Sequence, residues 1–229
     1  MTTAGTQVTR SRGFTIVELM VTIGIIGLLL GITFPALRTF RMESLNVNCQ
    51  SNLRQIGVLM ASYQNQNAGI LPMTEFLPAV TEDGPVGGLP WVMRGYMERD
   101  NKCWCCPADN DEANSLSTGT SYFYLPGLIR YMPNVQLQVQ QAMLPSMLDP
   151  DLTERQLESR RIGFEARLVT NLYQKDFMRL PLLHDSIDRH PGTRIPRNAL
   201  FMDGSAGIST DYSEILDQDG DDDGDGDGG

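Results

Sequence analysis

Residues 13–34 read GFTIVELMVTIGIIGLLLGITF, and this stretch decides the fold. The twenty-one residues from Phe14 to Phe34 contain one ionisable side chain, Glu18. About 20 apolar residues in a helix, each rising ~1.5 Å, span the ~30 Å hydrocarbon layer of a bilayer. The run is long for the apolar part of a secretory signal peptide, and no small-residue cleavage site follows it. The sequence therefore predicts a transmembrane helix over 14–34 that stays in the mature protein.

The charges beside this span indicate its orientation. Arg10 and Arg12 precede it, and the positive-inside tendency places that end in the cytoplasm. Arg38 and Arg41 follow the span and act against this orientation. We expect a single-pass protein of the cytoplasmic membrane, with residues 36–229 outside the cytoplasm.

Glu18 is the anomaly of the span, because a carboxylate in lipid is costly unless it is paired or neutral. One interpretation is that it reaches the headgroups, since it lies one turn from the start. The other is that cleavage between Gly13 and Phe14 creates an α-amine, which is cationic below pH ~8. That amine lies on the same helical face as Glu18 and can also meet the Glu18 of a neighbouring subunit. A paired charge is tolerated where a lone one is not.

The run R-G-F-T-I-V-E-L-M-V-T-I-G-I-I-G-L-L-L resembles the leader and N-terminal helix of type IV prepilins and type II secretion pseudopilins. The resemblance implies that a prepilin peptidase removes residues 1–13, cutting after Gly13 and methylating the Phe14 amine. It assigns Glu18 to subunit registration during assembly. It also accounts for Pro35, which stands where such helices often bend.

Pro35 lacks a backbone N–H and clashes with the preceding turn, so we expect a kink or local melting there. The helical pattern then resumes, which predicts an amphipathic continuation over 35–67 that Gly69 caps. The apolar face of this continuation carries Leu45, Cys49, Leu53, Ile56, Met60 and Tyr63. The opposite face carries Glu43, Asn46, Asn48, Ser51 and Arg54.

The head, residues 68–212, is predicted to be α+β, with an antiparallel sheet packed on the amphipathic part of the long helix. The best strand candidates are 91–93, 121–125 and 198–202. Asp203-Gly204 reads as a tight turn into a last strand over 206–209. Residues 151–161 are expected to form a surface helix that starts near Asp151.

A second resemblance covers the head. The segments C-Q-S-N-L-R-Q-I-G at 49–57, C-P-A-D at 106–109 and H-P-G…N-A-L-F-M-D-G-S from 190 to 205 are similar to pseudopilin-like families abundant in planctomycete-type bacteria. This likeness implies a fold and an assembly class rather than an activity. The acidic tail after the last hairpin departs from these families.

Four cysteines in 229 residues do not make a disulfide scaffold, but disulfides are permitted outside the cytoplasm. Cys49, on the apolar stripe, is expected to bridge to Cys106, whose loop can fold over the helix; such a bridge stabilises by roughly 3–4 kcal/mol. Cys103 or Cys105 are alternative partners, and a buried Cys49 thiol is the other interpretation. A zinc site from Cys103, Cys105 and Cys106 is disfavoured, because C-x-C-C lacks the paired C-x-x-C spacing.

The two histidines, His184 and His190, both stand beside turn residues. Cys–His and Asp–His pairs can serve nucleophilic catalysis. The sequence has no G-x-S-x-G, H-E-x-x-H, phosphate-loop or dinucleotide glycine pattern. Structural or capping roles are therefore favoured over catalysis.

The net charge of −10 argues against a nucleic-acid surface, which needs a basic stripe. Much of the excess lies in the tail, 213–229, whose last thirteen residues carry seven Asp. Asp219, Asp221 and Asp223 alternate as in a calcium loop, but the bidentate Glu of such a loop is missing. A disordered, self-repelling tail is favoured over weak calcium binding, and no other cofactor is expected.

The sequence thus favours a non-enzymatic structural subunit of a pilus-like or secretion filament. Its expected partners are the prepilin peptidase, copies of itself or other pilins and pseudopilins, an inner-membrane assembly platform and the lipid bilayer. The head would lie in a periplasmic or surface filament. One alternative is a membrane-tethered binding module or adhesin that does not polymerise, and another is an anchored hydrolase.

Overall fold

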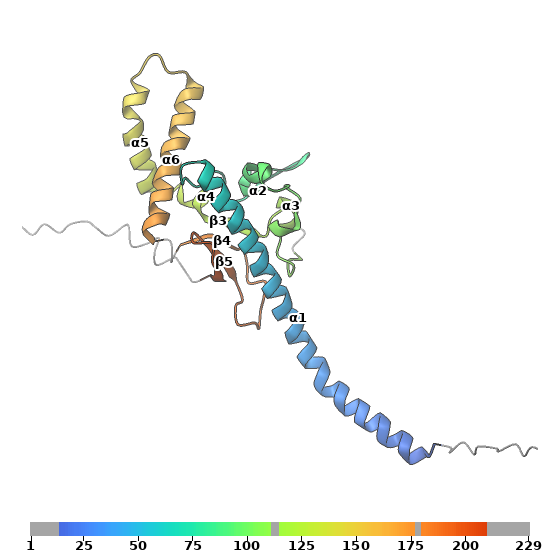
Figure 1. Ribbon diagram of the computed structural model, residues 1–229. Helices are drawn as coiled ribbons and strands as arrows, with labels where there is room; N and C mark the ends of the chain where they lie inside the picture. The colour runs from blue at the N-terminus through green and yellow to red at the C-terminus, as the bar shows by residue number, and fades with distance from the viewer. Residues whose placement is uncertain (1–13, 111–114, 177–179, 210–229) are drawn as a thin grey trace, which may run out of the picture. The chain divides into compact units, whose positions relative to one another are not determined.

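The structure is a computed structural model that describes residues 14–110, 115–176 and 180–209 (Figure 1). The expected leader and the expected acidic tail lie outside the described residues. The chain divides into two units, residues 1–41 and 42–229. The fold is α+β, as predicted: a long N-terminal helix is followed by antiparallel strands.

The first unit holds the start of α1 (Ile16–Gln66). Every residue from 14 to 41 is exposed, and the segment is long and apolar enough to cross a membrane, with a mean hydropathy of 2.3 over eighteen residues. Pro35 lies inside α1, which is not interrupted there, so the expected local melting does not occur. Proline removes one N–H donor from a helix that is well formed on both sides. The kink remains a prediction.

The second part of α1 presents its apolar stripe to the core of the head. Cys49, Leu53, Ile56 and Met60 are buried, as predicted. The helix ends at Gln66, and Gly69, with φ +78°, donates its N–H to the Gln64 carbonyl at 2.8 Å. Gly69 therefore closes the helix end as predicted, and Ala68 before it, with φ +54°, also adopts the left-handed geometry of this closure.

Asn46 was predicted to lie on the exposed polar face of this helix, and that prediction is wrong. Asn46 is buried, and its Oδ1 accepts a hydrogen bond from Asn198 Nδ2 at 2.8 Å. A buried amide is stable when its polar atoms are paired. The pairing explains why a polar residue lies on the inner side, where the sequence pattern placed it outside.

Four strands form the main sheet, in the order β3-β4-β5-β6 with every pair antiparallel. They are β3 (Tyr122–Tyr124), β4 (Pro181–Asp185), β5 (Asn198–Phe201) and β6 (Ala206–Ile208). The strands expected at 121–125 and 198–202 and the terminal hairpin are confirmed, with Gly204 in the left-handed region of its turn. The central strand β4 was not predicted. It is buried throughout, so its sequence shows no alternation of apolar and polar residues.

The strand predicted at 91–93 is wrong. Its residues lie in α2 (Gly88–Val92) and the 3-10 turn η1 (Met93–Gly95). Pro90 in the first turn pre-sets helical φ, and Gly87 and Gly88 adopt positive φ before it. The other small elements are β1 (Ala79–Thr81), β2 (Gly84–Val86), η2 (Lys102–Trp104), α3 (Ser115–Thr118) and α4 (Leu125–Ile129).

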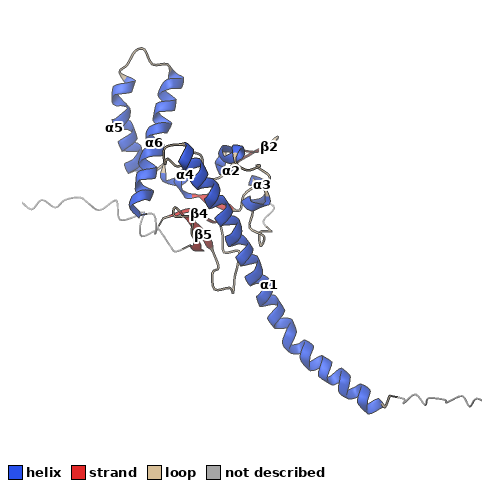
Figure 2. Cartoon of the chain, in the orientation of Figure 1, coloured by secondary structure: helices blue, strands red, loops and turns tan. Residues whose placement is uncertain are grey.

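The surface helix expected at 151–161 is longer than predicted. It is α6 (Glu154–Asp176), and it packs against α5 (Pro133–Met147) as a helical hairpin (Figure 2). Thr153 precedes the first turn of α6, two residues after Asp151, and the Thr153 N–H and Oγ1 donate to Gln156 Oε1 at 2.9 and 2.8 Å. The Glu165 carboxylate, buried on α6, lies 2.6 Å from Arg130.

Candidate functional site

The N-terminal site begins at Phe14, since Gly13 lies outside the described residues. Thr15 and Glu18 form a reciprocal cap at the start of α1. Glu18 Oε2 accepts from the Thr15 N–H at 2.9 Å and from Thr15 Oγ1 at 2.8 Å, and the Glu18 N–H donates to Thr15 Oγ1 at 3.2 Å. This S/T-x-x-E arrangement satisfies N–H groups that a helix leaves unpaired at its start. The isolated chain therefore already gives the Glu18 carboxylate hydrogen-bond donors.

The segment behind this cap is a continuous apolar surface. Its large side chains, from Phe14 to Phe40, are exposed over half or more of their surface in nearly every case. Exposed apolar patches of this extent mark contacts with membrane or protein. The site therefore consists of one acidic side chain at the helix start and a helix whose exposed apolar side chains require contact with lipid or other protein.

A second cluster of functional side chains lies inside the head, where α1 meets the sheet. Cys49 Sγ is 3.3 Å from Tyr122 Oη and 3.7 Å from Asp185 Oδ1. Cys106 Sγ is 3.2 Å from His190 Nε2. The ligand atoms of Cys49, Cys106 and His190 all lie within 4.8 Å of one another. None of these residues is more than 2% exposed.

Neighbouring groups hold this cluster in place. The Asn198 N–H donates to Asp185 Oδ2 at 2.8 Å, which fixes the carboxylate at the end of β4. Ser121 Oγ accepts from the Cys106 N–H at 2.9 Å and donates to Asp109 Oδ2 at 2.5 Å. Polar groups buried in this way are stable because nearly every one has a partner.

A buried ion pair that includes Asp109 lies beside Ser121, next to the cluster. Arg189 lies 3.0 Å from the Asp109 carboxylate, and both side chains are buried. Arg189 also donates to the Ser121 carbonyl at 3.1 Å and to Ser186 Oγ at 2.8 Å. The guanidinium thereby joins the loop after Cys106 to the loop after β4, the two segments that carry the cluster.

The proximity of these groups shifts their pKa values. Hydrogen bonds from Cys49, the larger cause, and from His190 together lower the pKa of Cys106 to about 5, against the effect of burial. The pKa of Cys49 is raised by its hydrogen bond with Cys106 and by burial. Burial raises the pKa of Asp185 to about 6, although the Asn198 N–H opposes this. Burial lowers the pKa of His184 to about 4.

The cysteines predicted to pair do come together, but the structure holds all four as free thiols. The Cys49–Cys106 bridge therefore is not formed in it and stays a prediction. Cys103 donates to Gln55 Oε1 at 3.3 Å, and neither Cys103 nor Cys105 joins the ligand group within the described part of the chain. The three aspartates of the predicted calcium loop, Asp219, Asp221 and Asp223, lie outside the described residues.

Sequence reasoning favoured a structural or capping role for His190 but did not place its ring against Cys106, where it is fully buried. It also missed Asp185, Asn198 and Tyr122. Each ends or begins a short strand, and a polar residue at such a position in an otherwise apolar strand is the signal that could have identified them. His184, by contrast, hydrogen-bonds through Nδ1 with the Asp185 carbonyl at 2.9 Å.

Cys106 and His190 have the separation of a nucleophile and its base. A nucleophile must also reach a substrate, and these residues are 2% and 0% exposed. Such burial is typical of a structural group and does not support the anchored-hydrolase hypothesis.

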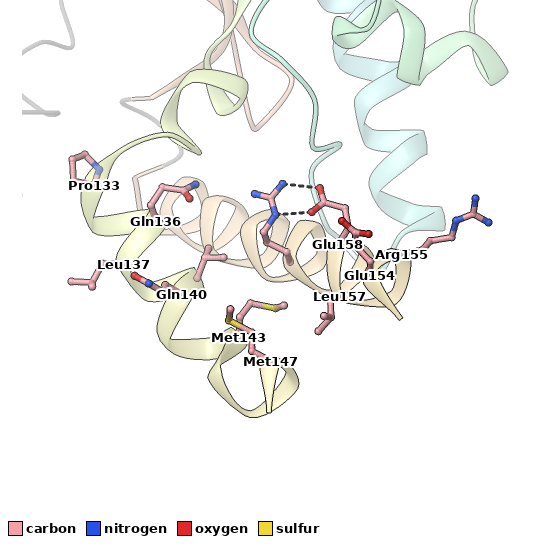
Figure 3. A pocket seen from close by; sticks show the side chains of 12 residues that line it. Pro133, Gln136, Leu137, Gln140, Met143, Met147, Glu154, Arg155, Leu157 and Glu158 are labelled. Atoms are coloured by element: carbon pink, nitrogen blue, oxygen red, sulfur yellow. Dashed lines mark hydrogen bonds and ion pairs between the residues drawn. The ribbon is translucent and has the colours of Figure 1, made fainter. Parts of the chain in front are cut away.

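A groove of about 960 Å³ lies between α5 and α6. Met143, Met147 and Leu157 line it, and the ion pair of Glu158 with Arg161, at 2.7 Å, stands beside them (Figure 3). Apolar grooves with a few polar groups at the rim are typical of binding sites.

Comparison with known proteins bears on the first of these sites. Residues 8–34 match the family model of the prokaryotic N-terminal methylation motif. The matched segment contains Gly13, Phe14, Glu18 and the whole apolar span, 14–34, and it is consistent with a prepilin-type cleavage and methylation protein. The motif supports a type IV pilin-like or pseudopilin subunit at the level of the family. Neither a curated protein nor a solved structure matches the chain.

Proposed function

We propose that the chain is a structural subunit, a pilin or pseudopilin, of a type IV pilus-like or type II secretion filament. The match of residues 8–34 to the methylation motif carries the proposal. In this function a prepilin peptidase removes the leader after Gly13 and methylates Phe14. The N-terminus starts in the cytoplasm, the helix anchors the subunit in the inner membrane, and the head is extracytoplasmic.

The exposed apolar half of α1 suits both stages of such a life cycle. In the membrane, lipid covers its side chains, all of which are exposed in the isolated chain. In a filament, the same side chains pack against the helices of neighbouring subunits. Lipid tails and these side chains are equally apolar, so moving from lipid to a filament brings no hydrophobic gain by itself. The exchange is favourable when close helix packing and polar pairing replace the contacts with lipid.

Glu18 supplies the polar pairing in this proposal. Its carboxylate is held by Thr15 in the isolated chain, so it is preformed at the helix start, next to the amine that cleavage after Gly13 exposes. The amine of one subunit meets the Glu18 of the next in the assembled filament. Such an ion pair in a medium of low dielectric sets the axial alignment of neighbouring subunits, because any other alignment leaves an unpaired charge.

The first test is the mature N-terminus, measured by mass spectrometry on protein made in a host with a prepilin peptidase. We expect a chain that begins at Phe14 and carries a methyl group on its amine. A chain that still begins at Met1, or that is cut elsewhere, contradicts the proposal.

The second test separates the charge of Glu18 from its role in capping. Glu18→Gln keeps an acceptor for the Thr15 N–H, since glutamine also serves in a capping box, but it removes the charge. We expect normal cleavage and few filaments by electron microscopy. The matched variant Thr15→Val removes the hydroxyl but keeps the charge, and it should still assemble. Normal filaments from Glu18→Gln would refute the pairing role.

The groove between α5 and α6 supports a second candidate function, a membrane-tethered binding module that does not polymerise. Correct cleavage combined with subunits that remain monomeric in membranes, in a host with the assembly machinery, would favour this function over the filament.

A further inference from the structure

We propose that Cys49, Cys106 and His190 bind a Zn²⁺ ion, with the Asp185 carboxylate as the fourth ligand, at the junction of α1 and the sheet. Thiolate, imidazole and carboxylate are the donor types that zinc takes, and four protein ligands are typical of a structural zinc site. The proposal does not depend on filament assembly.

The geometry of the three nearest donors supports the site. Zn–S distances are about 2.3 Å and Zn–N distances about 2.0 Å, so the ligand atoms of a tetrahedral site are roughly 3.5–4 Å apart. The sulfurs of Cys49 and Cys106 and a ring nitrogen of His190 lie within 4.8 Å of one another. Asp185 Oδ1 is 3.7 Å from Cys49 Sγ. The three nearest donors therefore already lie near a common centre, and in this proposal the Asp185 carboxylate joins them by moving toward Cys106 and His190.

The surroundings of Cys106 also fit a metal-bound thiolate. The backbone N–H of Ala108, two residues further along the chain, hydrogen-bonds to the Cys106 side chain. The Asp109 N–H donates to the Cys106 carbonyl at 2.9 Å and closes the C-P-A-D turn. A backbone donor directed at a sulfur orients the ligand and stabilises its negative charge, and the turn holds that donor in place.

A Cys49–Cys106 disulfide is the competing use of these sulfurs, and the contacts of His190 argue against it. Its Nδ1 is buried and has no hydrogen-bond partner among the described residues, so Nε2 makes the polar contact of the ring, with Cys106 Sγ. A disulfide would leave His190 Nε2, and the Asp185 oxygen beside Cys49, against sulfur atoms that donate no hydrogen bond. Zinc instead accepts a lone pair from Nε2 and from the carboxylate.

The burial of the cluster assigns the metal a structural role. Cys49, His190 and Asp185 are fully buried, and Cys106 is 2% exposed. The ligands come from α1, the loop after η2, the end of β4 and the loop before β5, which are distant in sequence. A metal that joins such segments contributes directly to the free energy of folding.

The test is the metal content of the full-length protein, purified in detergent without chelator and measured by plasma mass spectrometry. We expect about one Zn²⁺ per chain. Cys106→Ser and His190→Gln should each lower that content several-fold, whereas the matched control Cys103→Ser, a cysteine outside the cluster, should retain it. Asp185→Asn should bind more weakly than the native protein. Equal zinc in Cys106→Ser and Cys103→Ser would overturn the proposal.

A second set of measurements uses the native sequence, so that the proposal can be tested even if the variants do not fold. Cobalt exchanged for zinc should give sulfur-to-metal charge-transfer absorption, and a strong chelator should lower the melting temperature and expose two thiols to alkylation. An intact mass that shows a Cys49–Cys106 disulfide in metal-free protein contradicts the site. Metal-free protein whose thiols are all reduced, and which takes up no cobalt, contradicts it equally.

Discussion

The two halves of α1 share one helix but meet different surroundings. From 14 to 41 every residue is exposed, and apolar side chains occur on all sides. From 42 to 66 a single stripe is buried in the core of the head and the other side faces solvent. A helix that is apolar all round needs lipid or other protein, whereas an amphipathic one is satisfied by its own domain. The difference separates the part of the chain that serves assembly from the part that serves folding.

Polar residues within the two halves confirm this division. In the first half the carboxylate of Glu18 stands at the helix start, and Thr15, a residue of the same turn, holds it. In the second half Asn46 is held by Asn198, which is distant in sequence and begins β5. Local pairing leaves the first half free to change partners, and long-range pairing fixes the second half to the sheet.

The largest expected effect comes from a charge on the buried stripe. Ile56→Asp places a carboxylate at a fully buried position and should destabilise the head by roughly 4 kcal/mol or more, because an unpaired buried charge is among the costliest substitutions. Unfolding by denaturant in detergent, followed by near-ultraviolet circular dichroism, measures the change.

Val58→Asp is its matched control, two residues away on the exposed side of α1. It should change stability by less than about 0.5 kcal/mol, as exposed substitutions generally do. Equal losses in the two variants would show that the stripe does not decide the packing of the second half.

An intermediate effect is expected from a charge in the first half, and it should appear in a different measurement. Leu29→Lys places an ammonium five residues inside the end of the span and should disfavour membrane insertion by at most roughly 3 kcal/mol. Carbonate extraction of membranes should show less anchored protein, while the melting temperature of the head stays unchanged.

The control for Leu29→Lys is the same change on the head. Leu148 is 83% exposed at the end of α5, and Leu148→Lys should leave membrane retention as it is. Retention that falls equally in both variants, or a head that unfolds with Leu29→Lys, would break the division between the two halves.

The sequence predicted those parts of the fold that local patterns control. The apolar span, the buried stripe of α1, the Gly69 cap and the hairpin around Gly204 follow from residue type and period. The sequence did not predict β4, which is buried throughout and lacks alternation, or the full length of α6. The strand expected at 91–93 was wrong because Pro90 and two glycines with positive φ favour a helical turn.

The two sites differ in the same way. The N-terminal site is contiguous in sequence, so residue types and their spacing are enough to identify its motif. The buried cluster draws its residues from four segments, so their proximity depends on the fold of the whole head. Cys49 and Cys106 were identified as partners, but His190 and Asp185 join them through tertiary contacts that no local pattern records.

The smallest expected effect compares two glycines of α1, one in each half. A Cβ at Gly57 would lie 3.0 Å from Leu200 Cδ1, so the helix approaches β5 closely there, whereas a Cβ at Gly27 would meet nothing within 4 Å. Gly57→Val should destabilise the head by about 2 kcal/mol, because a tightly packed contact has no room for a branched side chain. Gly27→Val should leave the unfolding midpoint of the head unchanged in the same denaturant titration. If both variants shift that midpoint alike, the close approach of α1 to the sheet is not what requires a glycine at position 57.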